Sequence, residues 1–206
     1  MSRAVHARPR HRLIAILACA AAVAGVGAGG AAAAGAAAGA GAAGSHTCAN
    51  AHVAATASNL KRMRAAVLCL VNHQRTSRGL PALREDTRLD RAAQGWSSHM
   101  VATHQFTHGH NFAGRISAQG YNWSAAGENI ATGYPDPSSV VAGWMASAGH
   151  CRNILDPSFR AIGIGMVARP VTGYASGPAT WTQDFGLAMG VKPPSHKYGP
   201  RNGCPY

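Results

Sequence analysis

The hydrophobic pattern of this chain changes at Pro157, and that change constrains the fold more than any other feature. Before Pro157, apolar residues recur every three or four positions, which is the spacing of amphipathic helices. After it, the stretches 161–167 and 180–185 alternate in the manner of strands, and a turn-rich link between them predicts an antiparallel hairpin. Helices first and strands last, without regular alternation, indicate a layered α+β domain with a small antiparallel sheet.

Helix start and stop signals divide the first part of the chain. Asn59 and Asp136 stand where N-caps are expected, and Gly79 provides a stop for the first helix. The segment 106–134 is rich in glycine and aromatic residues, and it is predicted as loops with one short helical piece at 112–119. Trp96 and Trp144 lie on apolar helical faces and are expected in the core. Three longer helices are expected, at 59–78, 87–103 and 136–149.

The N-terminal region has the pattern of an export signal. Four arginines and no acidic residue occupy the first twelve positions, an apolar stretch follows, and 23 of the 25 residues from Ala20 to Gly44 are Ala or Gly. A cleaved signal is favoured. Only an uncleaved signal segment would anchor the protein in a membrane. We therefore expect a secreted or cell-envelope-associated protein, and the bias toward Arg, Ala and Gly indicates a bacterial source. The predicted organisation is a signal peptide with an Ala/Gly-rich segment at 1–44, a short lead-in at 45–58 and a single domain at 59–206.

The cysteine count agrees with export. Cys19 falls in the signal, and four cysteines remain, an even number that predicts two disulfides in an oxidising compartment. Four cysteines allow three pairings. Cys69 lies opposite the apolar stripe of its helix and is free to tether the segment that carries Cys48. We therefore predict Cys48–Cys69 and Cys151–Cys204.

Charge favours anionic partners. The chain has a net charge of +12, and without residues 1–44 it keeps 15 of its 19 Lys and Arg against 7 Asp and Glu, a net charge of +8. A positive surface attracts anionic envelope polymers, phospholipid headgroups or nucleic acid. Nucleic acid is excluded by the export signal and by the lack of basic runs interleaved with aromatic residues or of zinc-finger spacing. The expected partners are a lipid or an anionic envelope component.

Short motifs in a fixed order carry a family resemblance. They include Phe-Thr-His at 106–108, Gly-Glu-Asn-Ile at 127–130, the segment 144–155 and Trp-Thr-Gln-Asp-Phe-Gly at 181–186. Together they resemble the CAP superfamily, the cysteine-rich secretory, antigen 5 and pathogenesis-related-type proteins, over roughly residues 60–187. The resemblance implies a three-layer α-β-α sandwich with a broad cleft.

The same resemblance implies which residues line that cleft. His108 and Glu128 match the first histidine and first glutamate of the family site, and His150 matches its second histidine. The second family glutamate is replaced by Ser147, which removes one carboxylate. The expected cleft residues are His108, Glu128, Ser147, His150 and Asn153.

Two functional classes follow from these residues. Two imidazoles and one carboxylate form a ligand set used by zinc hydrolases, so His108 and His150 with Glu128 are candidate metal ligands for zinc or another divalent ion. The missing glutamate favours a non-enzymatic binding module that requires no cofactor and holds a lipid, an envelope component or a partner protein. The alternative is a metal-assisted hydrolase acting on an envelope substrate. A Ser147–His150–Glu128 hydrolase triad is disfavoured because the chain lacks a Gly-x-Ser-x-Gly elbow.

Overall fold

The computed structural model describes residues 47–193 and residue 204. The predicted signal peptide and Ala/Gly-rich segment at 1–44 lie outside these residues. No helix within the described residues is both long and apolar enough to cross a membrane. The predicted lead-in is described from residue 47, and it packs on the domain: Ala51 and Ala55 are buried, and their backbones bond to Ser138 and Pro135.

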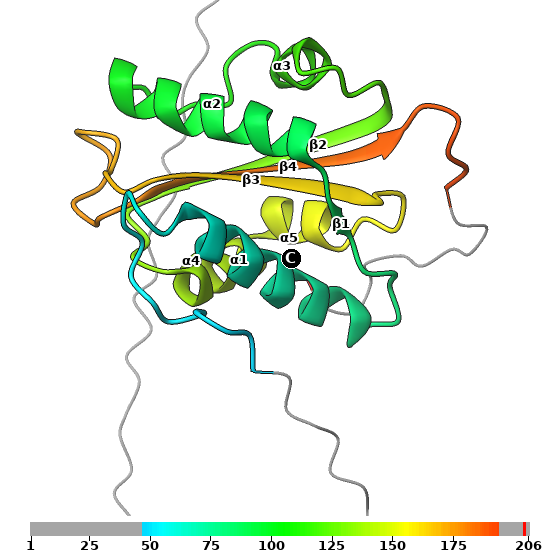
Figure 1. Ribbon diagram of the computed structural model, residues 1–206, viewed down its shortest axis with the longest axis horizontal. Coiled ribbons are helices and arrows are strands. Elements are labelled where there is room, and N and C mark those ends of the chain that lie inside the picture. The colour runs from blue at the N-terminus through cyan, green and yellow to red at the C-terminus, as the bar shows by residue number, and fades with distance from the viewer. Residues whose placement is uncertain (1–46, 194–203, 205–206) are drawn as a thin grey trace, which may run out of the picture. The chain divides into compact units, whose positions relative to one another are not determined.

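Four strands form one mixed sheet in the order β1-β3-β4-β2 (Figure 1). β3 (Ala161–Val167) and β4 (Thr180–Ala188) form the predicted antiparallel hairpin. The short β1 (Arg84–Glu85) runs parallel to β3 and was not predicted, because two residues carry no periodic pattern. β2 (Trp123–Thr132) pairs antiparallel with β4 and forms the other edge of the sheet.

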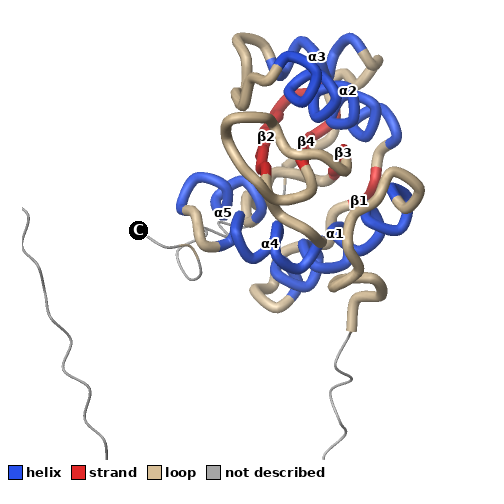
Figure 2. Tube along the Cα trace, turned by 90° about the vertical axis from the view of Figure 1, so that its left-hand side faces the viewer, coloured by secondary structure: helices blue, strands red, loops and turns tan. Residues whose placement is uncertain are grey.

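Helices cover both faces of this sheet. α2 (Thr87–Thr103) and α3 (Phe112–Ala118) lie on one face, and the opposite face carries α1 (Leu60–Thr76), α4 (Pro137–Met145) and α5 (Ala148–Ile154) (Figures 1 and 2). The predicted α+β class and three-layer sandwich are therefore confirmed. The larger core lies between the sheet and α1, α4 and α5, and it contains Met63, Val67, Trp144, Ile164 and Trp181.

Two sequence predictions about secondary structure were wrong. The segment 106–134 contains the ten-residue strand β2, which its glycine, alanine and polar residues concealed. Glu128 and Asn129 are buried within that strand, so apolar alternation could not reveal it. The helix predicted at 136–149 is two helices: α4 ends at Met145, and α5 starts after Ser147, whose extended backbone makes it the N-cap.

Close contact between α2 and the sheet depends on two glycines of β3. A Cβ atom on Gly163 would overlap the backbone of Leu89 and Asp90, and one on Gly165 would overlap the backbone of Ala93. The small-large alternation of β3 that predicted a strand therefore also sets the distance between the layers.

The two predicted disulfides are confirmed. Cys48–Cys69 joins the segment before α1 to the exposed side of that helix, and Cys151–Cys204 joins α5 to the C-terminal segment. The bridges span 21 and 53 residues. By restricting the unfolded chain, loops of this size stabilise a fold by about 3 and about 4 kcal/mol.

Asp90 anchors α2 to β3 from a buried position. Its Oδ1 accepts a hydrogen bond from the Ile164 N–H at 2.8 Å and lies 3.8 Å from Arg64 Nε. Burial raises the pKa of Asp90 to about 6, and the Ile164 N–H and the Arg64 charge oppose that rise. Because the folded state holds this proton more tightly than the unfolded chain does, the associated stability is complete below about pH 4 and is lost as the pH rises through 6.

We expect the free energy of unfolding of the native chain, relative to Asp90→Asn, to fall by about 2 kcal/mol between about pH 4 and about pH 7. Water around the partly exposed Arg64 screens part of the effect. Urea unfolding at a series of pH values measures the difference. Asp86→Asn is the control, because the hydrogen bond from Arg88 lowers the pKa of Asp86. The free energy of unfolding of the native chain relative to Asp86→Asn should therefore rise with pH, opposite to the Asp90 case. A pH-independent difference for Asp90→Asn would contradict the prediction.

Candidate functional site

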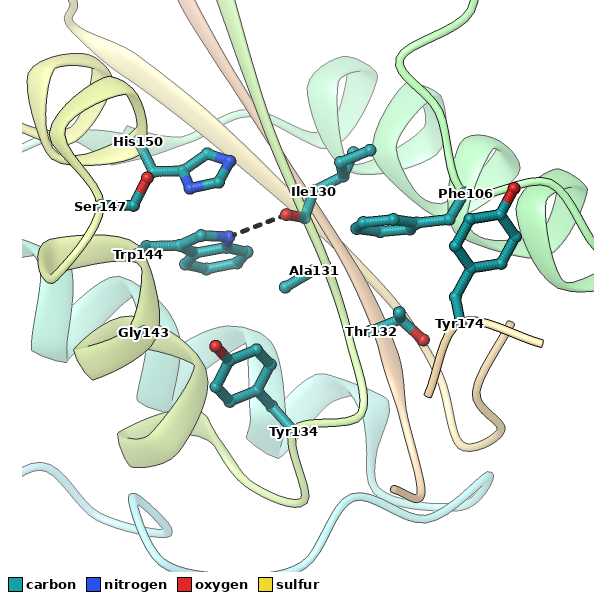
Figure 3. A pocket seen from close by; sticks show the side chains of 10 residues that line it. All are labelled: Phe106, Ile130, Ala131, Thr132, Tyr134, Gly143, Trp144, Ser147, His150 and Tyr174. Atoms are coloured by element: carbon teal, nitrogen blue, oxygen red, sulfur yellow. Dashed lines mark hydrogen bonds between the residues drawn. The ribbon is translucent and has the colours of Figure 1, made fainter. Parts of the chain in front are cut away.

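A pocket of about 320 Å³ lies on the side of β2 that faces away from β4, between residues of the two helical layers (Figure 3). Residues 130–132 of β2 form its floor. Phe106 and Tyr174 form one wall, with ring centroids 5.8 Å apart, and Trp144 and Tyr134 lie on the opposite side. The full lining is Phe106, Ile130, Ala131, Thr132, Tyr134, Gly143, Trp144, Ser147, His150 and Tyr174.

His150 and Ser147 supply polar groups at the α5 end of the pocket (Figure 3). The Ser147 side chain makes no capping hydrogen bond to α5, so its hydroxyl is not committed to the helix end. Burial lowers the pKa of His150, and the neighbouring His108 lowers it further. His150 is therefore a neutral imidazole at pH 7 that can donate one hydrogen bond and accept another.

Buried amides hold α5 against β2. Asn129 Nδ2 donates to the His150 carbonyl at 3.1 Å and to Gln183 Oε1 at 3.0 Å. Asn153 Nδ2 donates to the Glu128 carbonyl at 3.1 Å and to Asn129 Oδ1 at 2.9 Å. Asn153 therefore sets the position of the helix that carries His150 through these bonds to β2.

The Glu128 carboxylate is engaged by two side chains from the α2–α3 layer. His108 Nδ1 lies 2.8 Å from Oε1, and Arg115 Nη2 lies 2.5 Å from Oε2. Arg115 also donates from Nη1 to the His108 carbonyl at 3.1 Å. Glu128 has a side chain only 1% exposed, whereas that of His108 is 48% exposed. The buried carboxylate thus fixes an accessible histidine beside the pocket.

Arg115 is itself held by an aromatic ring. Its guanidinium lies 3.6 Å from the centroid of Trp96, and His99 stacks on the same indole at 4.6 Å. Trp96 Nε1 donates to the Thr107 carbonyl at 3.0 Å, next to His108. Trp96 packs against a small core cluster that includes Met100 and Ile130, as predicted, but it is only partly buried and it also supports the His108 loop. Trp144 is buried as predicted.

Asp184 completes this cluster from β4, where it is paired in register with Glu128. Burial raises the pKa of Asp184 well above its usual range, and the charge of Glu128 raises it further, while Arg115 opposes the shift. A protonated Asp184 can donate a hydrogen bond to the Glu128 carboxyl. Neither Arg115 nor Asp184 was predicted as a site residue, because each meets Glu128 only through folding.

The structure brings the five predicted cleft residues into one region. Ser147 and His150 line the pocket, while His108, Glu128 and Asn153 support its edge. The Glu128 carboxylate orients His108 rather than His150, so the Ser147–His150–Glu128 triad is not formed. Phe106 and Tyr174 were not predicted to line the site; the aromatic content of 106–134 was a signal for Phe106, whereas Tyr174 stands alone in a turn-rich link.

The residues present do not fit the predicted zinc site. Both oxygens of Glu128 already bond to His108 and Arg115, and the arginine places a fixed positive charge where a cation would compete for the carboxylate. Ser147, which the resemblance matches to the second family glutamate, supplies only a hydroxyl group. Within residues 47–193 and 204, no group of three or more His, Cys, Asp or Glu side chains is arranged to hold a metal ion.

An α-β-α sandwich with two disulfides, and with His150 in a pocket beside the pair formed by His108 and the buried Glu128, defines a class of fold rather than a particular activity. A model of the cysteine-rich secretory protein family, CAP, matches residues 68–185. The chain belongs to this family.

Two curated relatives come from Bacillus subtilis. The uncharacterized protein YkwD is 36% identical over 123 residues, which cover 58% of this chain and 45% of that protein. The uncharacterized membrane protein YlbC is 32% identical over 104 residues, which cover 48% of this chain and 30% of that protein. This chain therefore spans less than half of the length of either relative.

Solved structures agree with the fold. An extracellular protein containing a SCP domain from Bacillus anthracis has a TM-score of 0.54 and 26% identity, covering 64% of this chain and 44% of that one. A cysteine-rich secretory protein from Staphylococcus aureus has a TM-score of 0.53 and 16% identity, covering 63% and 40%. The second likeness concerns the fold alone.

Proposed function

We propose that this protein is an exported, non-enzymatic binding module that holds a lipid, an envelope component or a partner protein in the pocket at the edge of β2. The observation that carries the proposal is the composition of the pocket. Four aromatic side chains and Ile130 offer apolar area, while neutral His150 and Ser147 offer a few polar contacts that orient a ligand. Binding sites for small ligands and peptides have this combination.

Export rests on the arginine-rich and apolar N-terminal pattern and on the even number of cysteines. The Bacillus anthracis relative is described as extracellular, which supports the same location for this chain. Both disulfides would be stable in that compartment.

The geometry gives less support to the metal-assisted hydrolase. Such an enzyme needs a carboxylate or imidazole set that is free to hold an ion and activate water. Here Arg115 and His108 occupy the Glu128 oxygens, and that carboxylate serves to position His108.

Filling the pocket should abolish binding without unfolding the protein. The immobilised native chain and Ser147→Trp are each incubated with a detergent extract of the producing cell's envelope. We expect the amount bound to Ser147→Trp to be lower than the amount bound to the native chain by a factor of about ten or more. Ser147 is a suitable position because its side chain makes no capping bond. Ser98→Trp, on an exposed position of α2, is the matched control and should retain as much as the native chain.

The bound material is compared by mass spectrometry, and thermal unfolding checks that both variants are folded. Equal retention by Ser147→Trp and Ser98→Trp would refute binding at this pocket. Loss of retention after treatment with a chelator, or zinc-dependent hydrolysis of the extract, would favour the hydrolase instead.

A further inference from the structure

Two large apolar side chains are exposed on the 188–191 turn, which follows β4. Met189 is 66% exposed and Val191 is 45% exposed, although β4 itself is buried. Elsewhere in the described residues, the large apolar side chains that are exposed, Val53 and Tyr174, lie on separate loops. Single exposed apolar residues are ordinary, whereas two on one turn form an apolar tip that can contact another surface.

Arginines of α2 border this apolar tip through the 119–122 segment, which joins α3 to β2. Arg88 and Arg91 donate to main-chain carbonyls of that segment at 3.4 and 3.3 Å. The last residue of the segment accepts a hydrogen bond from the Met189 N–H at 2.9 Å. Lys192 follows the turn directly and is exposed. Three cationic residues therefore lie close to the apolar tip.

Few negative charges oppose these cations. All seven acidic residues lie in the described part of the chain, and of these only Glu85 is exposed. Asp86 pairs with Arg88 at 2.6 Å. Arg91 bonds to neutral groups of Gln119, so its charge is not balanced locally. The other five acidic residues are buried or hold backbone N–H groups: Asp90, Glu128, Asp136, Asp156 and Asp184.

The apolar tip lies at the opposite end of the sheet from the pocket. Trp123, at the start of β2, is paired with Ala188, whereas Thr132, at the end of β2, lines the pocket. A strand of ten residues spans about 30 Å. In Figure 1 the end of β4, β1 and the start of α2 lie at one end of the sheet, and the loop 168–179 lies at the other. A contact made by the tip therefore does not cover the pocket.

Charge attracts the domain to anionic surfaces but does not orient it. The net charge of +8 without residues 1–44 acts at a distance, and cations are spread over several elements. The apolar tip supplies the orientation, because it gains most when it leaves water. The two effects together select a partner that is anionic on its surface and apolar beneath it.

We infer that the 188–191 turn docks on a bilayer that contains anionic phospholipids. Met189 and Val191 enter the layer between headgroups and acyl chains, while Arg91 and Lys192 contact lipid phosphates. Buried apolar area and attraction to anionic lipids together hold proteins on a membrane surface without spanning it. A soluble anionic polymer matches the cations but has no apolar layer for the tip. This inference goes beyond the proposed function, because it assigns a second surface, away from the pocket.

Vesicle flotation measures this docking. The protein is collected after export and mixed with vesicles of equal parts phosphatidylglycerol and phosphatidylcholine, or of phosphatidylcholine alone. We expect binding to the phosphatidylglycerol vesicles, and binding at least about tenfold weaker to phosphatidylcholine. Added salt should weaken the binding to phosphatidylglycerol vesicles, because it screens the attraction between the cations and the headgroups.

The same substitution at two sites tests the apolar contact. Val191→Ser and Val53→Ser remove the same side chain from positions that are 45% and 41% exposed. Only Val191→Ser should bind the phosphatidylglycerol vesicles more weakly, by about threefold or more. Met189→Ser combined with Val191→Ser should weaken binding by about tenfold or more. Thermal unfolding checks that each variant is folded, and if the double variant is not, Val191→Ser against Val53→Ser decides.

A second matched pair tests the cations. Arg91→Gln combined with Lys192→Gln, and Lys61→Gln combined with Arg62→Gln, each remove two positive charges from exposed positions. Lys61 and Arg62 begin α1, which lies on the other face of the sheet (Figure 1). Binding to phosphatidylglycerol vesicles should fall by about tenfold in the first double variant. In the second it should fall by about twofold or less, through the change in net charge alone.

Equal binding of Val191→Ser and Val53→Ser would overturn the inference, as would equal losses in the two charge variants. Equal binding to both kinds of vesicle, or binding to neither, would overturn it too. Vesicle binding that soluble polyphosphate displaces, and that loss of both apolar side chains leaves unchanged, would assign the cations to an anionic polymer instead. These outcomes leave the pocket untouched, and its test remains the comparison of Ser147→Trp with Ser98→Trp.

Discussion

Replacing Arg115 with methionine should lower the free energy of unfolding by about 3 kcal/mol. Arg115 bonds to the Glu128 carboxylate, whose side chain is 1% exposed, and stacks on Trp96. Without the guanidinium, the carboxylate stays buried beside Asp184 and keeps only the His108 imidazole as a side-chain partner, so its charge loses its permanent counter-charge. Chemical denaturation at pH 7 measures the loss.

Two further variants separate the buried charge from general loss of contacts. Arg115→Met combined with Glu128→Gln should be less destabilised than Arg115→Met alone, because the charge leaves together with its partner. Arg91→Met is the matched control: Arg91 also joins α2 to the α3 end, but through the neutral Gln119 at an exposed position. It should change the stability by no more than about 0.5 kcal/mol. Equal losses for Arg91→Met and Arg115→Met would contradict the prediction.

Replacing Arg75 with methionine should cost still more, about 4 kcal/mol. Arg75 is fully buried at the end of α1, and burial, with a smaller effect of Arg160, lowers its pKa to about 10. It remains charged at neutral pH. Its guanidinium donates to the carbonyls of Pro81, Ile154, Asp156 and Phe159.

The stability lost in Arg75→Met should come from the several N–H donors of the Arg75 guanidinium rather than from the removal of an arginine as such. Arg75→Lys should be more stable than Arg75→Met but less stable than the native chain. The planar guanidinium reaches carbonyls of several segments at once, and the compact ammonium of lysine cannot. Arg78→Met, at the exposed end of the same helical region, should be nearly neutral, since Arg78 bonds mainly to Gln74. Guanidinium chloride unfolding compares the three variants, and a small effect of Arg75→Met would show that the carbonyls find other donors.

Much of the fold could be predicted from local pattern. The helix expected at 87–103 has those bounds in the structure, and the hairpin at 161–167 and 180–185 differs only by three added residues of β4. These elements have a regular apolar period. β2 could not be predicted in this way, because Glu128 and Asn129 are buried by partners far away in the sequence.

In the candidate site too, the sequence predicted which residues take part, and the tertiary structure decided their contacts. Motifs predicted His108, Glu128, Ser147, His150 and Asn153, and folding places them at one edge of the sheet. What each contacts was not predictable. Asp184 meets Glu128 only because β2 pairs with β4, and Arg115 meets it only because α3 packs beside β2.

The sequence by itself determined the helix at 87–103, the hairpin and the family, because each depends on local period or ordered motifs, and its even number of cysteines predicted two disulfides. Only the tertiary structure decided that β2 is an edge strand of the described sheet, that Arg115 and His108 bind the two oxygens of Glu128, which cysteines pair, and that aromatic side chains line the pocket beside β2. These features arise from pairings between distant segments, which no local window of the sequence contains.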